Sequence, residues 1–436
     1  MFLRIKRLRS RRHITKMNAE NSKKYNIAHL HWGFPPIIGG VETHLTILLP
    51  TLAEMEHKVS LLTCSVEGVL GDEEYKGVRV VRRPIMDLNW LAQRGLHGIE
   101  REVRKVLSSF IDDCQPDILH AHNMHYFSKI HAKVLEELSI KKGIPLFLTA
   151  HNVWDDDLYL ELTTCIKWTH IISVSHFIEK ELIGVGCHHR HVTTIHHGID
   201  TRMFRPNIDP APIYKKFPQL KDRKVIFHPA RMGLAKGCDV SIKALRIIKE
   251  KYPDVMLVLA GTKNIVDWGL TQQKDIAYLV TLSEKFNLRD NVLIDAYSLE
   301  EMPLLYAASE VCIYPSTAFE PFGLTMLEAM ASEVPMVVTK AGGMPEIIQD
   351  GINGYVVPMK GYEELASRII QLFSDDKLRD RLGRVGRSMV TTRFTRKIVT
   401  KATLRLYRQF LENHLPNVVD DKVENDSSNN THLGKV

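Results

Sequence analysis

The chain has 436 residues, of which 44% are hydrophobic and 25% are charged. This length predicts two domains or three, and the composition is ordinary for a globular protein with a sizeable core. No apolar run reaches the length of a membrane span, and the basic segment 1–16 has no apolar stretch like that of a secretory signal. We therefore expect neither a membrane-spanning nor a secreted protein.

The net charge of +7 is unevenly placed along the chain. Seven basic residues and no acidic ones lie in residues 1–16, so the rest of the chain has a net charge of zero. A body without excess positive charge argues against nucleic-acid binding. Residues 1–24 are expected to form a disordered tail, whose charge would suit peripheral contact with an anionic membrane. A start at Met17 would remove this basic segment.

The six cysteines are scattered and form no Cys-x-x-Cys pair. They predict neither a disulfide framework nor a zinc site, and they suit a reducing compartment. We therefore expect a cytoplasmic protein, with any membrane association on the cytoplasmic face.

The first half of the chain alternates apolar strands with helices. A loop rich in glycine and proline, residues 33–40, follows the first strand, and a helix with one apolar face begins near Val41. Strands that are apolar throughout are typical of a parallel sheet covered on both faces. The predicted strands are residues 25–31, 57–63, 78–82, 117–122, 146–151 and 171–175, and a further helix is predicted over 95–114.

The same alternation restarts after a proline-rich linker at 206–220. The second set of strands is predicted over 224–229, 255–260, 292–294, 311–314 and 335–339, with helices over 361–375 and 396–414. The polar segment 416–436 predicts a second disordered tail. We therefore expect an α/β protein with two parallel-sheet domains, residues 25–205 and 206–395.

Residue types that suit a binding site gather where the predicted strands end. In open parallel sheets, ligands bind beyond the carboxyl ends of the strands. With two such sheets, the expected site is the cleft between them. The residues at these ends are Gly39, Gly40, His122, His151, Ser175, Arg231 and Glu320.

The segment from Glu320 to Glu328 carries the strongest signal. An apolar helical period begins after Pro-Phe-Gly, so Glu320 lies in a loop and Glu328 about one turn into a helix. The free amides of residues 322–325 would hold an anion, and the flanking carboxylates would accept hydroxyl groups. This pattern fits a ligand that is part phosphate and part sugar. For Glu328 alone, a solvated surface glutamate is the commoner reading.

Other residues fit such a ligand, although each has an ordinary structural reading as well. Arg231 and Lys236 share a short loop and could clamp a diphosphate, or they could be solvated. Gly39 and Gly40 would let a phosphate approach the backbone, or they could form a turn. His151 ends a buried strand and could donate to a sugar hydroxyl, or it could be a satisfied core histidine.

Metal binding is not expected. The His-rich segment 187–191 lacks zinc-site spacing, and its sequence reads as a surface turn. No Asp-x-Asp element marks a metal–diphosphate clamp, and the three aspartates at 155–157 are predicted to lie in an exposed loop.

Several short motifs occur one after another along the chain, in an order that matches a known family. They are Gly39-Gly-Val-Glu-Thr-His44, Phe204-Arg-Pro206, Arg231 with Lys236-Gly237, Glu320-Pro-Phe-Gly with Glu328, Gly342-Gly-Met-Pro-Glu346 and Asp350-Gly-Ile-Asn-Gly-Tyr355. Together they resemble the family 4 glycosyltransferases over roughly residues 25–410. One departure is His197-Gly198, where the family often has Asn-Gly.

The resemblance implies a GT-B fold, with two Rossmann-like domains facing across a cleft and residues 396–415 forming a helix that crosses back to the N-terminal domain. It implies transfer of a hexosyl or N-acetylhexosaminyl group from a nucleotide diphosphate sugar, a UDP- or GDP-sugar, with retention of configuration. No metal or other cofactor is implied. The acceptor is left open among a glycan, a lipid-linked sugar and a small molecule.

The resemblance also implies roles for individual residues. His151 and Glu320 would be catalytic, and Glu328 would hold the ribose. Glu320, Pro321 and Phe322 would contact the donor sugar, and Tyr297 and Ser298 the base. The diphosphate would be held by Gly39, Gly40, Arg231, Lys236, Gly323, Leu324 and Thr325. The acceptor side would be lined by Trp32, Phe34, Met124, Tyr126, Trp154 and segment 84–100.

Two other classes of function share parts of this pattern. A sugar phosphorylase of similar architecture would use inorganic phosphate in place of the nucleotide, and Glu328, suited to a ribose, argues against it. A degenerate transferase acting as a binding or scaffold protein would have lost motif residues, whereas Glu320, Arg231, Lys236 and His151 are all present.

Overall fold

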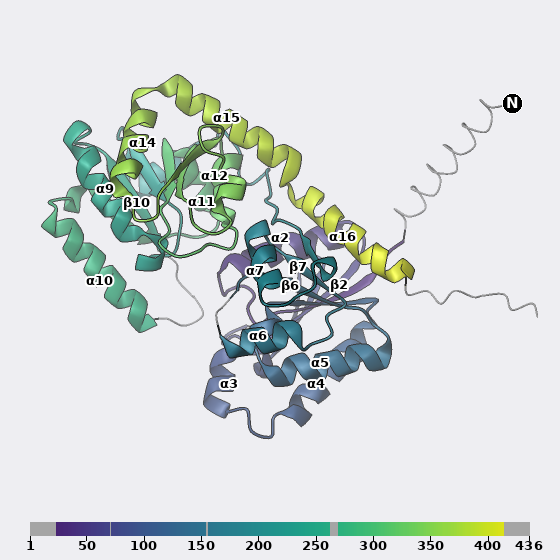
Figure 1. Cartoon of the computed structure of the whole chain (residues 1–436). Coiled ribbons are helices and arrows are strands. Elements are labelled where there is room, and N and C mark those ends of the chain that lie inside the picture. Colours follow the sequence, from purple (N-terminus) through teal and green to yellow (C-terminus); the bar gives the residue numbers. More distant parts are fainter. Residues whose placement is uncertain (1–22, 70, 154–155, 262–268, 414–436) are drawn as a thin grey trace, which may run out of the picture.

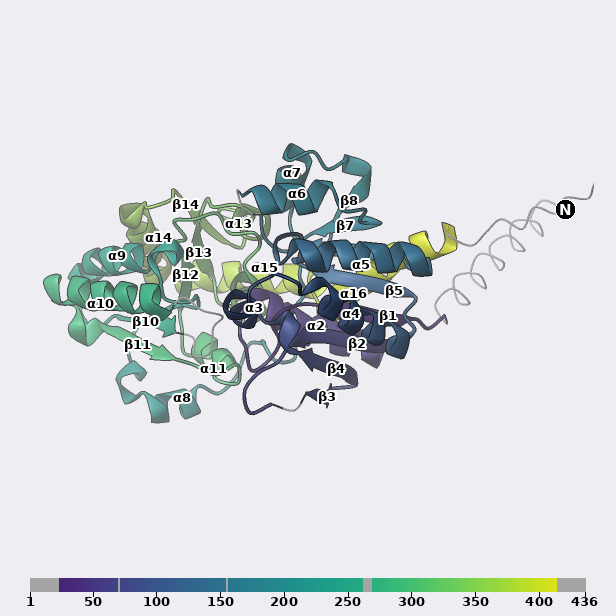
Figure 2. The same ribbon diagram turned by 90° about the horizontal axis from the view of Figure 1, so that it is seen from below.

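The computed structural model describes residues 23–69, 71–153, 156–261 and 269–413 (Figure 1). These residues form two α/β domains, each built on one sheet, and a long C-terminal helix runs from one domain onto the other (Figures 1 and 2). The basic segment 4–16 and the polar segment 416–436, both expected in disordered tails, lie outside the described residues.

The N-terminal domain is an eight-stranded sheet covered by helices. Its strands are β1 (Asn26–Leu30), β2 (Lys58–Cys64), β3 (Asp72–Tyr75), β4 (Val78–Arg83), β5 (Ile118–His122), β6 (Leu146–Ala150), β7 (His170–Ser173) and β8 (Val192–Thr194). Its helices are α2 (Gly40–Glu54), α3 (Leu88–Arg94), α4 (Glu100–Cys114), α5 (Lys129–Lys142), α6 (Asp157–Thr164) and α7 (His176–Gly184). The spatial order is β3-β4-β2-β1-β5-β6-β7-β8, and every pair is parallel except β3 with β4.

The C-terminal domain is a six-stranded sheet whose neighbouring strands are all parallel. Its strands are β9 (Val225–His228), β10 (Met256–Gly261), β11 (Val292–Ala296), β12 (Val311–Tyr314), β13 (Met336–Thr339) and β14 (Gly354–Val357). Its helices are α8 (Ala211–Lys216), α9 (Cys238–Lys251), α10 (Gly269–Lys285), α11 (Met302–Ala307), α12 (Leu324–Ala331), α13 (Met344–Ile347), α14 (Tyr362–Ser374) and α15 (Asp376–Arg393).

The strand order of the second sheet, β11-β10-β9-β12-β13-β14, is that of a nucleotide-binding Rossmann domain. The order reverses between β9 and β12, and ligands bind at the carboxyl ends of the strands at such a point. The loop with Arg231 follows β9, and the loop with Glu320 follows β12. In the first sheet the order reverses between β1 and β5, so the ends of these strands, at His31 and His122, meet in the same way.

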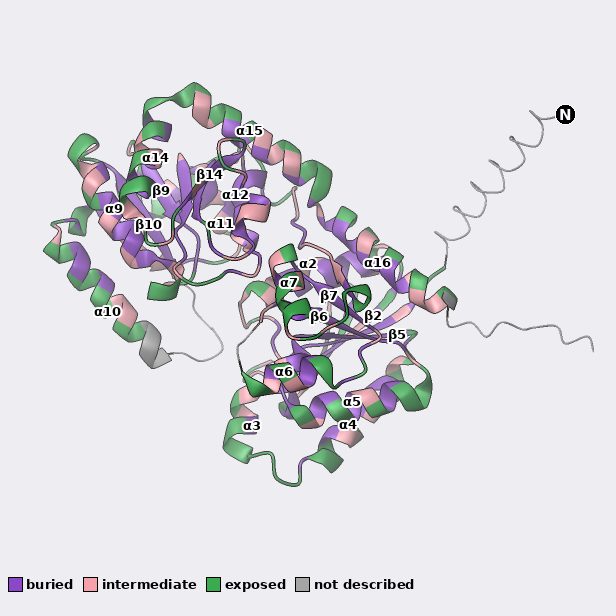
Figure 3. Cartoon of the chain, in the orientation of Figure 1, coloured by how far each residue is buried: buried purple, intermediate pink, exposed green. Residues whose placement is uncertain are grey.

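The buried residues lie along both sheets and on the inward faces of the helices, while the outward helix faces are exposed (Figure 3). Strands such as β5, β6 and β9 are buried at every position, although His120, His122 and His228 interrupt their apolar sequences. No helix within the described residues combines the length and the apolar composition that a membrane crossing needs.

The chain passes between the domains twice, and the two crossings are hydrogen-bonded to each other. The amide of Ile199 donates to the carbonyl of Phe394 at 2.8 Å, and the amide of Arg396 donates to the carbonyl of Ile199 at 3.0 Å. Beyond the second crossing, α16 (Arg396–Asn413) packs against α2 of the N-terminal domain. The expected crossing helix is therefore confirmed.

Three strands were not predicted from the sequence, β3, β8 and β14, of which β8 has only three residues. β3 is a charged edge strand, Asp72-Glu-Glu-Tyr75, which is held by ion pairs from Arg82 to Glu73 (2.6 Å) and from Arg83 to Asp72 (2.6 Å). β14 is only four residues long. Of the three aspartates expected in an exposed loop, Asp155 lies outside the described residues. Asp156 is exposed and non-helical as expected, and it caps α6 by accepting a hydrogen bond from the amide of Tyr159. The expectation was wrong for Asp157, which is the first residue of α6.

Candidate functional site

The N-terminus of α12 is the centre of the candidate site. Its N-cap residue is Gly323, which has no side chain to cap the first turn, and its backbone is in the left-handed region at φ 89°. The Oγ1 atom of Thr325 is buried and has no hydrogen-bond partner among the described residues. Free amides and an unpaired hydroxyl at a helix N-terminus favour an anionic ligand such as phosphate.

Glu320 lies in the loop before α12, where it is buried and paired with a cation. Its Oε1 atom forms an ion pair with Nζ of Lys236 and accepts a hydrogen bond from Oγ of Ser316 at 3.2 Å. Lys236 reaches this position because its loop is tied to the next one: the amide and hydroxyl of Thr317 donate to the carbonyls of Ala235 and Leu234 at 3.0 and 2.8 Å. A carboxylate and an ammonium group are thus held together beside the helix N-terminus.

Two glycines permit the tight packing of these loops. Gly237 has φ 77°, and a Cβ atom there would lie 1.8 Å from the carbonyl oxygen of Pro315. Gly342 has φ 58°, and a Cβ atom there would lie 2.3 Å from the carbonyl oxygen of Glu320. Any side chain at either position would displace the backbone next to the site.

Glu328 lies inside the first turns of α12 and is buried against Tyr306. The Tyr306 hydroxyl donates a hydrogen bond to its Oε2 atom at 2.8 Å. Burial raises the pKa of the Glu328 carboxyl to about 7, although the bond from Tyr306 acts in the opposite direction. The structure therefore does not place Glu328 on a solvated surface.

Arg231 and the Gly39-Gly40 loop approach the site from the two domains. Arg231 is exposed, and Gly39 is the N-cap of α2. The carboxylate of Glu42 lies against Gly39, where an added Cβ atom would be 2.3 Å from Oε2, and the charge of Arg231 acts on it. Burial alone would raise the pKa of Glu42, but a 3.0 Å hydrogen bond to His31 and the charge of Arg231 outweigh it and lower that pKa.

His151 directly follows β6 and is almost fully buried. Its Nε2 lies 3.0 Å from Nδ1 of His122, and its Nδ1 lies 3.4 Å from Nε2 of His197. The His197 ring also contacts the ring of Phe322, with centroids 4.9 Å apart. One imidazole thus separates His151 from the Glu320-Pro-Phe-Gly segment of the other domain.

The residues expected at the base differ in their surroundings. Tyr297 is buried, its ring lies edge-on to Phe217 at 5.6 Å, and its hydroxyl has no partner among the described residues. Ser298 is exposed, and its amide donates to Glu301 at 2.8 Å. Both lie beyond the end of β11, and their role in base binding stays a prediction.

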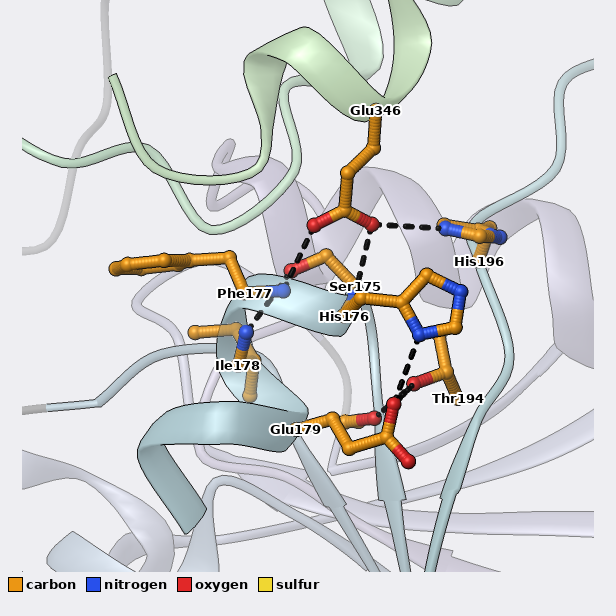
Figure 4. Close-up of polar contacts among 9 residues, drawn as sticks. Ser175, His176, Phe177, Ile178, Glu179, Thr194, His196 and Glu346 are labelled. Carbon is orange, nitrogen blue, oxygen red and sulfur yellow. Dashed lines mark hydrogen bonds and ion pairs between the residues drawn. The ribbon is translucent and has the colours of Figure 1, made fainter. Parts of the chain in front are cut away.

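Glu346 links the two domains directly (Figure 4). From α13 its carboxylate accepts hydrogen bonds from the amides of His176 (2.8 Å) and Phe177 (2.7 Å), the first residues of α7 in the other domain. Its Oε2 atom also lies 3.3 Å from Nε2 of His196. Burial would raise the pKa of Glu346, but these hydrogen bonds outweigh it and lower that pKa.

Two family models match the chain. Residues 38–203 match the model described as Glycosyltransferase Family 4, and residues 212–389 match Glycosyl transferases group 1. The chain belongs to the family 4 glycosyltransferases. Each match corresponds to one domain of this transferase, because the first ends after β8 and the second begins before β9.

Curated relatives and solved structures agree with this membership. The transferase is 25% identical over 399 residues to an uncharacterized glycosyltransferase of Methanocaldococcus jannaschii, covering 88% of this chain and 98% of the relative. It is 24% identical over 418 residues to a glycogen synthase of Mycobacterium tuberculosis, covering 87% and 94%. Its fold matches the structure of Anabaena Alr3699/HepE in complex with UDP and glucose, with a TM-score of 0.72, 20% identity and coverage of 88% and 99%. The predicted GT-B fold is confirmed.

The structure of the transferase gathers most of the predicted residues, and it adds some that were not predicted. Glu320 and Lys236 form an ion pair in the loops next to α12, the helix that contains Thr325. His151 lies among other buried histidines, and one of these, His197, contacts the ring of Phe322. The roles of Glu42 and Glu346 were missed, although both lie in family motifs. Phe34 and Met124, expected to line the acceptor side, are buried in the core, and Trp154 lies outside the described residues.

Proposed function

We propose that this transferase is a retaining enzyme whose donor is a UDP-sugar, bound with its diphosphate at the N-terminus of α12. The observation that carries the proposal is this uncapped helix end, with the unpaired Oγ1 of Thr325 inside it and a buried glutamate on each side. The UDP and glucose bound in the Anabaena protein of the same fold support a UDP-sugar over a GDP-sugar.

The chemistry of the leaving group follows from this placement. When the bond between sugar and diphosphate breaks, negative charge grows on the departing phosphate. Lys236, Arg231 and the α12 amides are fixed cationic or donor groups around that position, so they stabilise the charge in the transition state more than in the ground state. In this proposal, the two side chains supply what a metal ion supplies in other transferases.

Retention of configuration is proposed from the family resemblance, and the surroundings of the carboxylates bear on the route by which it would occur. A double displacement needs a carboxylate free to attack the anomeric carbon. Glu320 is occupied by Lys236 and Ser316, and Glu42 is occupied by His31. We therefore propose that the acceptor attacks on the face from which the diphosphate leaves, with that phosphate accepting the acceptor's proton.

Donor binding is the first test. A thermal-shift panel of UDP-, GDP- and ADP-sugars is expected to show the largest rise in melting temperature with a UDP-sugar. In calorimetry, Arg231→Ala is expected to weaken UDP binding about tenfold through loss of a charge-assisted contact. The matched control is Arg246→Ala, an exposed arginine of α9 in the same domain. A panel in which no nucleotide sugar raises the melting temperature would refute the proposal.

The stereochemical and metal questions have separate tests. Once an acceptor is found, the anomeric coupling in the proton NMR spectrum of the fresh product shows whether configuration is retained. Activity is expected to survive EDTA, and abolition by the chelator with recovery on adding Mg²⁺ or Mn²⁺ would contradict metal independence.

We also propose that the transferase works in the cytoplasm on a glycan, a lipid-linked sugar or a small-molecule acceptor. All six cysteines are free, in agreement with a reducing compartment. Basic residues 4–16 would add contact with an anionic membrane and so favour a lipid-linked acceptor. Sedimentation with vesicles of anionic lipid, with and without this segment, tests the contact.

A further inference from the structure

The N-terminal domain contains a buried cluster of histidines at the carboxyl ends of its strands. Six rings form one connected cluster, in which each ring contacts at least one other: His29 on β1, His44 on α2, His120 and His122 on β5, His151 after β6 and His197 after β8. None has more than 6% of its surface exposed. Buried imidazoles at this density need an explanation, because each brings two polar nitrogens into the core.

Two overlapping sets of three have the spacing of a metal site, one made of His29, His120 and His122 and the other of His44, His122 and His151. Both ring nitrogens of His120 are already hydrogen-bonded, to Tyr407 and Thr149, so the second set is the better candidate. One nitrogen each of His44, His122 and His151 lies within 4.8 Å of the other two. Nδ1 of His122 and Nε2 of His151 are 3.0 Å apart. Two nitrogens bound to one tetrahedral Zn²⁺ are about 3.3 Å apart, given Zn–N bonds of about 2.0–2.1 Å. A modest inward shift of His44 would complete a three-histidine set.

The hydrogen bonds around the three histidines point to the same arrangement. Nδ1 of His44 is buried and has no partner among the described residues. The outer nitrogen of His122, Nε2, lies 3.0 Å from Nδ1 of His29, and the outer nitrogen of His151, Nδ1, lies 3.4 Å from Nε2 of His197. A metal-bound histidine characteristically uses its second nitrogen in this way, because the outer contact fixes its ring and tautomer.

The surroundings also suit a cation. All three rings are buried, which disfavours the charged imidazolium, and the neutral imidazole is the form that binds a metal. A negative charge lies close by, because Glu42 is bound to His31, whose Nδ1 lies 3.2 Å from the carbonyl oxygen of His122.

We propose that His44, His122 and His151 form a binding site for a divalent transition metal, of which Zn²⁺ is the best match. Three imidazoles suit Zn²⁺ and leave a fourth position for water.

The site has a consequence for activity, which rests on the proposed function. His151 cannot both bind Zn²⁺ through Nε2 and turn that nitrogen to a donor sugar. Occupation of the site therefore inhibits sugar transfer, and EDTA reverses the inhibition. A transferase that needs no metal would in this way be sensitive to one.

Direct metal binding tests the site independently of catalysis. The full-length protein, freed of metal with a chelator, is loaded with Zn²⁺, desalted and analysed by mass spectrometry for zinc. We expect about one Zn²⁺ per chain. Co²⁺ is expected to give the intense visible absorption of a four-coordinate site with nitrogen ligands. No retained zinc, or the weak spectrum of six-coordinate Co²⁺, would overturn the proposal.

Variants assign the ligands. His44→Gln is expected to weaken Zn²⁺ binding about 100-fold, and His29→Ala, which removes an outer contact of His122, about tenfold. The matched control is His188→Gln, in the exposed segment 187–191, which should bind zinc like the wild type. A UDP-induced thermal shift shows that each variant is folded. Wild-type affinity in folded His44→Gln would overturn the site, whereas zinc binding without inhibition would instead remove His151 from the proposed donor contacts.

Discussion

The two glutamates that flank the α12 N-terminus lie in different surroundings. Glu320 is bound to Lys236 and Ser316, whereas Glu328 faces the Tyr306 hydroxyl in a buried position. Glu320 is thus fixed in direction by a cation, and Glu328 is held where burial opposes its charge. Replacing Glu320 is therefore expected to change turnover, and replacing Glu328 is expected to change the pH dependence of donor binding.

Replacing Glu320 tests the sugar contact. Glu320→Gln keeps the shape of the side chain but removes the charge that holds Lys236. Misplacement of a reacting group by about 1 Å costs about 10²-fold in rate, so we expect a loss of turnover of that order. UDP affinity, measured by calorimetry, is expected to change little, because UDP carries no sugar for this carboxylate to contact and Lys236 keeps its charge beside the α12 amides. Wild-type turnover in this variant would exclude the role.

The pKa of Glu328 predicts a pH dependence of donor binding. Since burial raises that pKa to about 7, the carboxyl is protonated below this pH and ionised above it. The ionised form accepts stronger hydrogen bonds from ribose hydroxyls, so affinity for a UDP-sugar should rise from about pH 6 to about pH 8. Calorimetry across this range should show a flat profile for Glu328→Gln; a rise that persists in the variant would contradict the assignment.

At the scale of elements, two helix N-termini face the boundary between the domains, and they differ in what binds their free backbone amides. The first amides of α7 are bound by the Glu346 carboxylate from the opposite domain (Figure 4). The first turn of α12 has no side-chain cap. The first helix end thus serves contact between the domains, and the second is left for a ligand.

Glu346→Gln tests the contact between the domains. The amide side chain keeps one acceptor oxygen but loses the charge that favours the α7 N-terminus, which is worth about 0.3–1 kcal/mol at an exposed site and up to about 2 when partly buried. We expect a larger radius of gyration by small-angle X-ray scattering and a raised KM for the donor. Glu363→Gln, in the exposed first turn of α14, is the control. Unchanged scattering and KM would show that other contacts hold the domains together.

The elements also show what could be read from the sequence. Buried strands such as β12 and β13 were predicted because runs of apolar residues carry their own signal. β3 was missed because its residues are charged and its stability comes from Arg82 and Arg83 on the next strand. The histidine cluster and Glu346 were missed for a related reason, because their partners are distant along the chain. Hydrogen-bonded histidines of the cluster are 29 to 93 positions apart, as for His122 with His151 and His29 with His122, and Glu346 is 170 positions from His176.

At the scale of the whole molecule, α16 joins the C-terminal domain to the N-terminal one. Its first residue, Arg396, forms an ion pair with Glu54 at 2.8 Å and donates to Thr51 at 3.0 Å, both on α2. Further along, Tyr407 is buried beside Phe147 of β6, with ring centroids 5.0 Å apart. The last helix of the chain thus completes the core of the first domain.

Arg396→Ala tests this connection. Loss of a buried guanidinium leaves the Thr51 hydroxyl without its donor, and we expect about 1–3 kcal/mol less stability. The measurement is a urea unfolding curve, in which the midpoint falls. Arg405→Ala, an exposed arginine on the same helix, should leave the midpoint in place. Equal midpoints for both variants would show that the apolar contacts of α16 are sufficient.

The paired crossings between the domains have a mechanical consequence. Because Ile199 is bonded to both Phe394 and Arg396, the two chain segments form one short ribbon and not two independent tethers. Such a ribbon bends readily across its width, whereas twisting it would break the bonds between its edges. We infer that the two domains rotate relative to each other about a single hinge axis, which lies at these paired crossings. A donor bound on one side would then meet every acceptor along the same arc.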